Sequence, residues 1–177
     1  MKRRWHDLLF ALSLAALTWV AQAGHAAAQP VPAPAASPAA AAAVSNDAAA
    51  DAAMAAMIAA GGAEGDRWLG LIDQGKFDES WVAAAVVLQE AITQKDWTAD
   101  LVARRPRLGR TIMRERKSGS YSRTLRGAPT GDYVVVTYLT KFEKTPLVEE
   151  TLAVAKDALG QWHVAGYDIA LSAVKAP

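Results

Sequence analysis

The chain of 177 residues contains no cysteine, which excludes disulfide bonds, catalytic thiols and a cysteine-linked lipid anchor. It also lacks a phosphate-binding loop, a dinucleotide fingerprint and the Gly-x-Ser-x-Gly motif of serine hydrolases. Histidine is scarce, and His163 is the only one after residue 25. A folded domain in this chain must therefore be held together by its core alone, and it offers few residues for catalysis.

The one long apolar run lies at the N-terminus and has the pattern of an export signal. Lys2-Arg3-Arg4 precedes a mainly apolar stretch from Leu8 to Val20, and a small-x-small triplet that signal peptidase cleaves ends at Ala23. The apolar stretch is shorter than the ~20 residues that a membrane-spanning helix needs. We expect residues 1–23 to be a signal peptide, and the mature protein to be periplasmic or secreted with no transmembrane segment.

Residues 24–61 are predicted to be an alanine-rich linker. Up to Ser45 this linker carries prolines at 30, 32, 34 and 38, which favour a disordered, semi-extended spacer. Asn46 or Asp47 then fits the N-cap of a short helix, which Gly61-Gly62 is expected to end. The helix is either a spacer or a docking segment, and the spacer is favoured because its apolar stripe is only one turn wide. This stripe consists of Met54, Met57 and Ile58.

Three further helices are predicted at residues 64–74, 77–92 and 96–105. Gly75 is suited to end the first, because glycine adopts the left-handed conformation without strain. Phe77 and Asp78 resemble a hydrophobic staple and an N-cap, with Val82 as the partner of the staple. Pro106 is expected to end the third helix, because it disfavours helical geometry in the preceding residue. Three tryptophans on apolar faces are expected in the core: Trp68, Trp81 and Trp97.

After Gly109 the pattern changes to β segments, at 110–117, 120–126, 133–139, 148–156 and 161–171. Ser118-Gly119 suits the turn of a tight hairpin between the first two. In the last segment the apolar positions change from even to odd numbers, which predicts a β-bulge near Ala165-Gly166. Residues 62–171 are therefore predicted to be a single α+β domain, with N-terminal helices packed on a curved four- or five-stranded antiparallel sheet. A disordered tail is expected at 172–177.

Several local patterns follow one another between residues 66 and 170. Together they resemble the bacterial domain of unknown function 4019, a family of small exported proteins. The resemblance implies a compact domain in the cell envelope and transfers no catalytic residues, because the family has no agreed activity. The order of helices before a sheet is also similar to the cystatin-like and nuclear-transport-factor-like folds. The patterns are Phe77-Asp78-Glu79-Ser80-Trp81, Trp97, Arg107-Leu108-Gly109, Arg114, Gly131-Asp132-Tyr133-Val134-Val135-Val136, Tyr138-x-Thr140-x-Phe142, Glu150-Thr151 and Trp162-x-Val164-Ala165-Gly166-Tyr167.

No catalytic constellation is visible in the sequence. His163 has no partner at metal-ligand spacing, and three serines between residues 118 and 122 would have only this histidine as a base. Glu149 and Glu150 are adjacent, so they point to opposite sides of a strand and cannot share a substrate. Glu150 has the parity of buried positions, and an ion pair with a strand arginine is its expected state. We expect no enzyme activity, no metal and no cofactor.

The strongest functional signal is positive charge concentrated between residues 104 and 126. This segment holds nine basic residues against one acid, a balance of +8, whereas the whole precursor has a net charge of only +1. Such a strip would attract anionic envelope components or an acidic partner protein, because guanidinium groups match phosphate and carboxylate oxygens. Nucleic acid is disfavoured by the compartment. The alternative is a solvated edge that keeps the sheet from pairing with another sheet. The candidate anion-binding residues are Arg104, Arg105, Arg107, Arg110, Arg114, Arg116, Lys117, Arg123 and Arg126.

Two functions remain open from the sequence. The first is a non-catalytic binding or structural domain, monomeric or weakly dimeric, that uses the basic strip. The second is a small-molecule binding or enzyme-like domain with a pocket in the concave face of the sheet. The residues expected to line that pocket are Tyr133, Tyr138, Phe142 and Tyr167.

Overall fold

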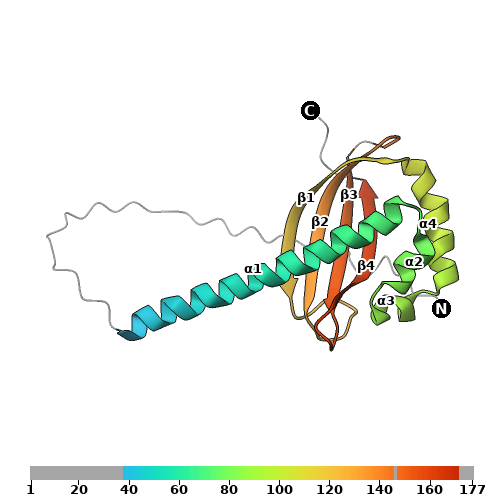
Figure 1. The fold of residues 1–177 in the computed structure, drawn as a ribbon. Coiled ribbons are helices and arrows are strands. Elements are labelled where there is room, and N and C mark those ends of the chain that lie inside the picture. Colours follow the sequence, from blue (N-terminus) through green and yellow to red (C-terminus); the bar gives the residue numbers. More distant parts are fainter. Residues whose placement is uncertain (1–37, 146, 172–177) are drawn as a thin grey trace, which may run out of the picture.

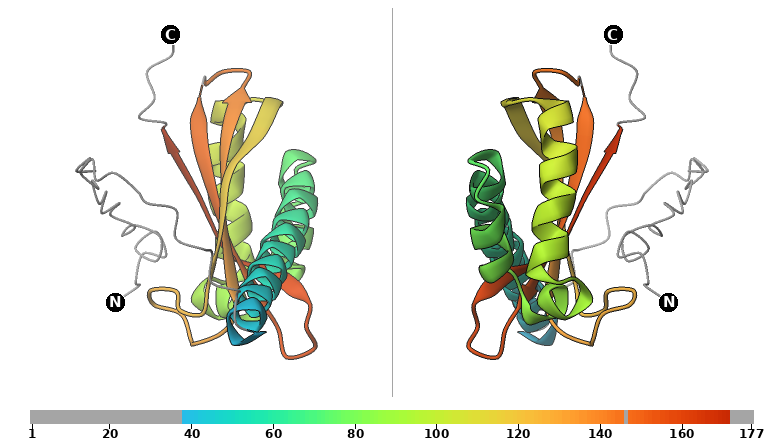
Figure 2. Two further views of the ribbon diagram at one scale, coloured as in Figure 1. Left: turned by 90° about the vertical axis from the view of Figure 1, so that its left-hand side faces the viewer. Right: turned by 90° about the vertical axis from the view of Figure 1, so that its right-hand side faces the viewer.

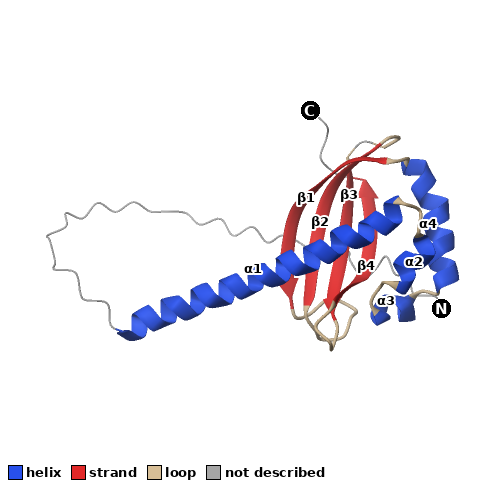
Figure 3. Ribbon diagram, in the orientation of Figure 1, coloured by secondary structure: helices blue, strands red, loops and turns tan. Residues whose placement is uncertain are grey.

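The computed structural model describes residues 38–145 and 147–171, in which four helices precede four strands (Figures 1 and 3). The predicted signal peptide and the tail at 172–177 lie outside these residues. Among the described residues, no helix is both long and apolar enough to cross a membrane. The α+β class is confirmed. The elements are α1 (Pro38–Asp73), α2 (Phe77–Val82), α3 (Val86–Ala91), α4 (Gln94–Leu108), β1 (Thr111–Ser122), β2 (Tyr133–Phe142), β3 (Val148–Lys156) and β4 (Trp162–Leu171).

The strands form one antiparallel sheet in the order β1-β2-β3-β4, so each strand pairs with its neighbour in the chain. Helix α1 crosses one face of the sheet, and α2 to α4 lie beside its β4 edge (Figure 2). Val134 and Leu152 point toward α1 and are fully buried. They share a core with Trp68 and Trp97, whose ring centroids lie 5.8 Å apart. The two tryptophans are buried as predicted.

Helix α1 is continuous, so the stop predicted at Gly61-Gly62 is wrong. The spacer predicted up to Ser45 is likewise helical from Pro38 onward. At Gly61 the helix lies so close to β2 that an added Cβ would be 2.7 Å from the Cβ of Val134. Glycine here allows the close approach of helix and sheet, and the resulting packing outweighs its low helix propensity.

The helix predicted over 77–92 is instead two short helices, because the chain between them bonds to the sheet. Ala85 is extended, and its N–H donates to the carbonyl of Val164 in β4 at 2.9 Å. The side-chain amide of Gln89 donates to the carbonyl of Trp81 at 3.0 Å and so covers the end of α2. Val82 is 64% exposed and is not the partner of a staple. Tertiary contacts therefore divide a segment whose local pattern is helical.

Helix α4 begins at a capping residue, Thr93, whose hydroxyl accepts from the N–H of Asp96. Its predicted end at Arg105 is wrong, because the helix includes Pro106 and continues to Leu108. The guanidinium of Arg105 is fixed by carboxylates of α1 and β3, and these contacts outweigh the local preference of a residue before proline.

The hairpin predicted at Ser118-Gly119 is wrong, because β1 is one strand that passes through these residues. Its pairing with β2 skips one residue between Arg116 and Ser118, so Lys117 is the extra residue of a bulge. Between Met113 and this bulge the even-numbered residues face α1, and after the bulge the odd-numbered residues do. Gly119 lies against α1, where an added Cβ would be 2.7 Å from the Cγ2 of Ile58.

The bulge predicted near Ala165-Gly166 in β4 is confirmed. Ala153 pairs with Gly166 and Val154 pairs with Val164, which leaves Ala165 as the extra residue. The bulge turns both Val164 and Tyr167 toward the core, where both are fully buried.

Candidate functional site

A buried ion cluster lies between α1, α4 and the sheet, and Glu150 is at its centre. Glu150 is completely buried. Its Oε2 accepts hydrogen bonds from Nε of Arg114 at 2.8 Å and from the hydroxyl of Thr140 at 2.5 Å. Its Oε1 accepts from the hydroxyl of Tyr167 at 2.5 Å, and Nη1 of Arg105 lies 3.6 Å from the same oxygen. The expected ion pair with a strand arginine is present, and these partners together compensate the buried charge.

Asp73, the last residue of α1, is the second carboxylate of the buried ion cluster. It accepts from Nη2 of Arg105 at 2.6 Å, from Nη1 of Arg114 at 2.7 Å and from the hydroxyl of Thr111 at 2.8 Å. Burial opposes its ionisation, but the hydrogen bonds and charge of Arg114 outweigh this effect, so the pKa of Asp73 lies below its usual value. Two carboxylates thus balance two guanidinium groups.

The chemistry of the buried ion cluster fits a structural role. Burial and the charge of Glu150 raise the pKa of Tyr167 well above its usual value, which keeps its hydroxyl protonated as a donor. Burial favours the neutral form of Arg114, yet Asp73 and Glu150 outweigh it and raise the pKa of the guanidinium. The shifts of Asp73, Arg114 and Tyr167 thus keep the carboxylate ionised, the guanidinium charged and the phenol neutral, so none of these three groups is poised to exchange a proton near neutral pH.

A polar pocket of about 510 Å³ lies beside the buried ion cluster and is lined by Asp66, Arg114, Arg116 and Tyr138. We call it the Arg116 pocket. Asp66 of α1 accepts from the hydroxyl of Tyr138 at 2.7 Å and forms an ion pair with Nη2 of Arg116. Burial and this hydrogen bond raise the pKa of Tyr138, so its hydroxyl also remains a donor.

The guanidinium of Arg116 is positioned from three sides. It lies against α1 at Gly62, where an added Cβ would be 2.5 Å from its Nη1. Its central carbon is 5.9 Å from the centre of the Tyr138 ring, and Asp66 holds its Nη2. The side chain of Arg116 nevertheless remains 35% exposed, and that of Asp66 is 53% exposed. Arg116 is thus both fixed and accessible.

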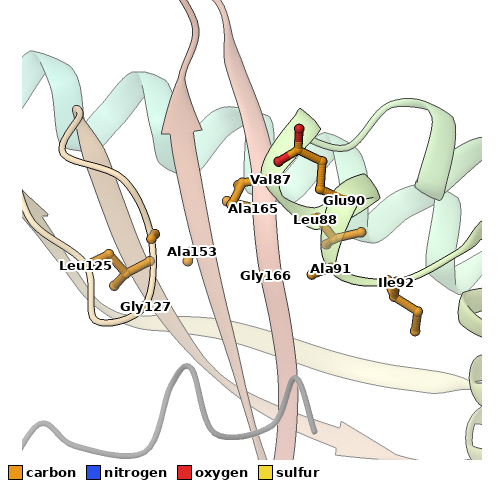
Figure 4. A pocket seen from close by; sticks show the side chains of 11 residues that line it. Val87, Leu88, Glu90, Ala91, Ile92, Leu125, Gly127, Ala153, Ala165 and Gly166 are labelled. Atoms are coloured by element: carbon orange, nitrogen blue, oxygen red, sulfur yellow. The ribbon is translucent and has the colours of Figure 1, made fainter. Parts of the chain in front are cut away.

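An apolar pocket of about 260 Å³ lies elsewhere, between α3, the loop after β1 and strands β3 and β4 (Figure 4). Its floor consists of small residues of the sheet, and its only charged residue is Glu90 of α3. We call it the apolar pocket. It is lined by Val87, Leu88, Glu90, Ala91, Ile92, Leu125, Gly127, Ala128, Ala153, Ala165 and Gly166.

The predicted basic strip does not form one surface. Arg105 and Arg114 belong to the buried ion cluster, and five other members have a carboxylate within 4.0 Å. These five are Arg104, Arg110, Arg116, Lys117 and Arg123, paired with Asp100, Glu143, Asp66, Glu115 and Asp132 respectively. Arg107 in α4 and Arg126 in the loop after β1 are exposed. A charge count along the chain misses this pairing, because most of the acids come from outside the strip.

The four aromatic residues proposed to line a concave pocket are not brought together. Tyr138, Phe142 and Tyr167 point toward the helices and are at most 2% exposed. Tyr133 has the opposite parity on β2, and its hydroxyl donates to the carbonyl of Pro129 in the loop after β1. Tyr138 lines the Arg116 pocket, whereas Tyr133, Phe142 and Tyr167 line neither this pocket nor the apolar pocket.

The remaining candidates for catalysis lie apart. Nε2 of His163 lies 3.3 Å from Oδ2 of Asp157. The hydroxyl of Ser122 donates to the carbonyl of Thr124 in the loop after β1. Ser122 and His163 lie on the two edge strands of the sheet. Within residues 38–145 and 147–171, no group of three histidine or acidic side chains could hold a metal ion.

Sequence reasoning missed Asp66 and Asp73, the two acids of α1 that bind arginines in the Arg116 pocket and in the buried ion cluster respectively. They are seven residues apart, which is two helical turns, and so share a face of α1. Acids at this spacing beside the apolar position Leu69 were the available signal.

Residues 64–167 match the family model described as Protein of unknown function (DUF4019). This chain belongs to the DUF4019 family. No curated protein and no solved structure is similar enough to be matched. The DUF4019 match runs from the second half of α1 into β4, and it therefore includes the buried ion cluster, the four residues that line the Arg116 pocket and the apolar pocket.

Proposed function

We propose that this protein is an exported, non-catalytic binding domain of the bacterial envelope that recognises anionic groups through Arg116. Export is supported by the basic start, the short apolar run and the cleavage triplet within residues 1–23. Anion binding is supported by one observation, a guanidinium that three neighbours position at the wall of a pocket of about 510 Å³.

Arg116 is suited to exchange its partner. Asp66 occupies one side of the guanidinium, and both side chains are partly exposed. An exposed ion pair contributes only about 0–1 kcal/mol, so a carboxylate or phosphate group can replace Asp66 at little cost. The planar guanidinium can then bind two oxygens of the anion, as it does in bidentate pairs.

Arg114 has a different part in this site. Each of its three nitrogens donates to Glu150 or Asp73, so its guanidinium is committed to the buried ion cluster. Reversing its charge would disrupt the buried ion cluster, and a loss of binding in such a variant would say nothing about the pocket. The test therefore has to rely on Arg116 and Asp66.

The experiment is a titration of the mature protein with inorganic phosphate and with acetate, followed by the Nε–Hε resonance of Arg116 and by calorimetry. We expect saturable binding that weakens with added salt, because screening shortens the range of surface charges to about 8 Å at physiological ionic strength. Arg116→Gln should abolish binding, and Asp66→Asn should strengthen it because the internal competitor is gone. Arg123→Gln, at a residue whose side chain is 74% exposed, is the matched control and should bind like the wild type.

Equal binding of phosphate by the wild type and Arg116→Gln would refute the proposed site. Vesicles that contain phosphatidylglycerol separate the two sources of a phosphate group. Binding to vesicles but not to free phosphate identifies a lipid headgroup, and the reverse identifies a soluble anion.

The export part of the proposal has its own test. Intact mass of the protein from the envelope fraction should correspond to a chain that begins at Gly24. Retention of residues 1–23 in that fraction would contradict cleavage after Ala23.

A further inference from the structure

The apolar pocket lies on the face of the sheet opposite α1. Ala153 and Gly166 pair across β3 and β4 and form its floor. Their chain neighbours Leu152 and Tyr167 are buried in the core beneath α1, and side chains alternate between the two faces of a strand. Leu88 and Ile92 line the pocket on one side, and Leu125 lines it on the other (Figure 4).

Several local features combine to keep this space empty. The floor carries only a methyl group and a hydrogen at the paired positions Ala153 and Gly166, and the bulge residue Ala165 is also small. The non-helical segment between α2 and α3 is fixed by the hydrogen bond from the N–H of Ala85 to the carbonyl of Val164, and it places α3 beside this floor. A sheet surface of ordinary Val or Ile residues would fill the same volume.

Glu90 supplies the only charge at the apolar pocket. It is exposed, and the described residues offer it no hydrogen bond or ion pair (Figure 4). The surrounding side chains are aliphatic, so the pocket combines an apolar interior with one carboxylate at its rim. This pattern complements a molecule with an aliphatic chain and a positive head, since an anionic head would be repelled.

The volume limits the length of that chain. At roughly 30 Å³ for a water-sized group, 260 Å³ accommodates about nine such groups. That is enough to hold an alkyl chain of about eight carbons.

We propose that the apolar pocket is a binding site for a short aliphatic amine, with the alkyl chain on the floor formed by Ala153 and Gly166 and the ammonium group at Glu90. This site is independent of the Arg116 pocket, because it lies on the other face of the sheet and takes the opposite charge.

The test uses octylammonium, octanol and octanoate as probes with the mature protein. Binding is followed by the backbone amide resonances of Ala153, Ala165 and Gly166. We expect octylammonium to shift these resonances saturably, octanol to bind a fewfold more weakly and octanoate to bind weakest. Octanoate binding as tightly as octylammonium would overturn the proposal, as would octylammonium shifts confined to other parts of the protein.

Three variants separate charge from shape. Glu90→Gln should weaken octylammonium about two- to fivefold, the range of an exposed charge pair, and leave octanol unchanged. Glu149→Gln, an exposed carboxylate on the same face of the sheet as Ala153, is the matched control and should bind like the wild type. Ala91→Trp places a large side chain in the pocket from an exposed position, and it should abolish the binding of octylammonium and of octanol. The melting temperature of this variant should be unchanged. Equal loss of octylammonium binding in Glu90→Gln and Glu149→Gln would reject the specific role of Glu90.

Discussion

Arg114 and Glu150 lie on strands that do not pair with each other, yet Nε of Arg114 is 2.8 Å from Oε2 of Glu150. The guanidinium reaches across β2 at Thr140, which pairs with Arg114 in the sheet and donates to the same carboxylate oxygen. Side chains thus join three consecutive strands in addition to the backbone ladder. The buried charge of Glu150 depends on a partner two strands away.

Glu150→Gln should destabilise the domain by about 3–5 kcal/mol, because Arg105 and Arg114 would keep their two charges while only the carboxylate of Asp73 remained to balance them. Urea unfolding of both proteins measures the difference. Glu149→Gln changes the neighbouring exposed residue in the same way and should stay within about 0.5 kcal/mol of the wild type. A similar small effect for Glu150→Gln would mean that the buried ion cluster contributes little.

Asp73 should make stability depend on acidic pH. Its pKa is lowered in the folded protein, so its contribution is fully present above the unfolded pKa near 3.9 and is lost as pH falls toward the folded value. Between about pH 5 and pH 3 the wild type should therefore lose unfolding free energy more steeply than Asp73→Asn. Asp51→Asn, in the exposed part of α1, should keep the wild-type slope. Parallel slopes for Asp73→Asn and the wild type would exclude this linkage.

Two glycines of α1 should respond to alanine in opposite directions. Gly61→Ala places a methyl group 2.7 Å from the Cβ of Val134 and should cost about 1–3 kcal/mol, as overpacking does. Gly70→Ala meets only the end of Gln74 at 3.9 Å and should stabilise the helix by about 0.5–1 kcal/mol. Thermal and urea unfolding distinguish these outcomes, and a stabilising Gly61→Ala would show that α1 can move away from the sheet.

Removal of residues 24–45 from the mature chain should leave the melting temperature unchanged within error. Residues 24–45 are mainly alanine and proline, which have little apolar side-chain area to bury, and residues 46–56, which would then begin the helix, are exposed. Calorimetry of the full and shortened proteins measures this. A fall of several degrees would reveal packing of the deleted segment on the domain.

The sequence predicted features that rest on local periodicity. Strand 148–156 and the bulge at Ala165 followed from alternation along the chain, because residues of one parity must face the core. The parity of Glu150 likewise indicated its burial and its arginine partner. The same reasoning was available for β1, where the parity of core-facing residues changes at Lys117, but Ser118-Gly119 also fits a turn.

Features that depend on distant contacts were not predictable in this way. Gly61 and Gly119 carry the local signature of a helix end and of a turn, yet both permit the close approach of α1 to the sheet. The α1 acids of the two polar sites lie far before their arginine partners in the chain: Asp73 is 41 residues before Arg114, and Asp66 is 50 residues before Arg116. The charge of the strip was therefore visible in the sequence, whereas its neutralisation was not.

The first half of α1 has a mechanical consequence. Its side chains are exposed from residue 46 to residue 56, and Figure 1 shows this part of the helix extending beyond the sheet. At 1.5 Å per residue, residues 38–60 span roughly 34 Å along a fixed direction. A flexible chain of that length would have a root-mean-square extent of roughly 26 Å with a wide spread. A group attached at the N-terminal end of this helix would therefore be kept at a more constant distance from the sheet than a flexible linker of the same number of residues could maintain.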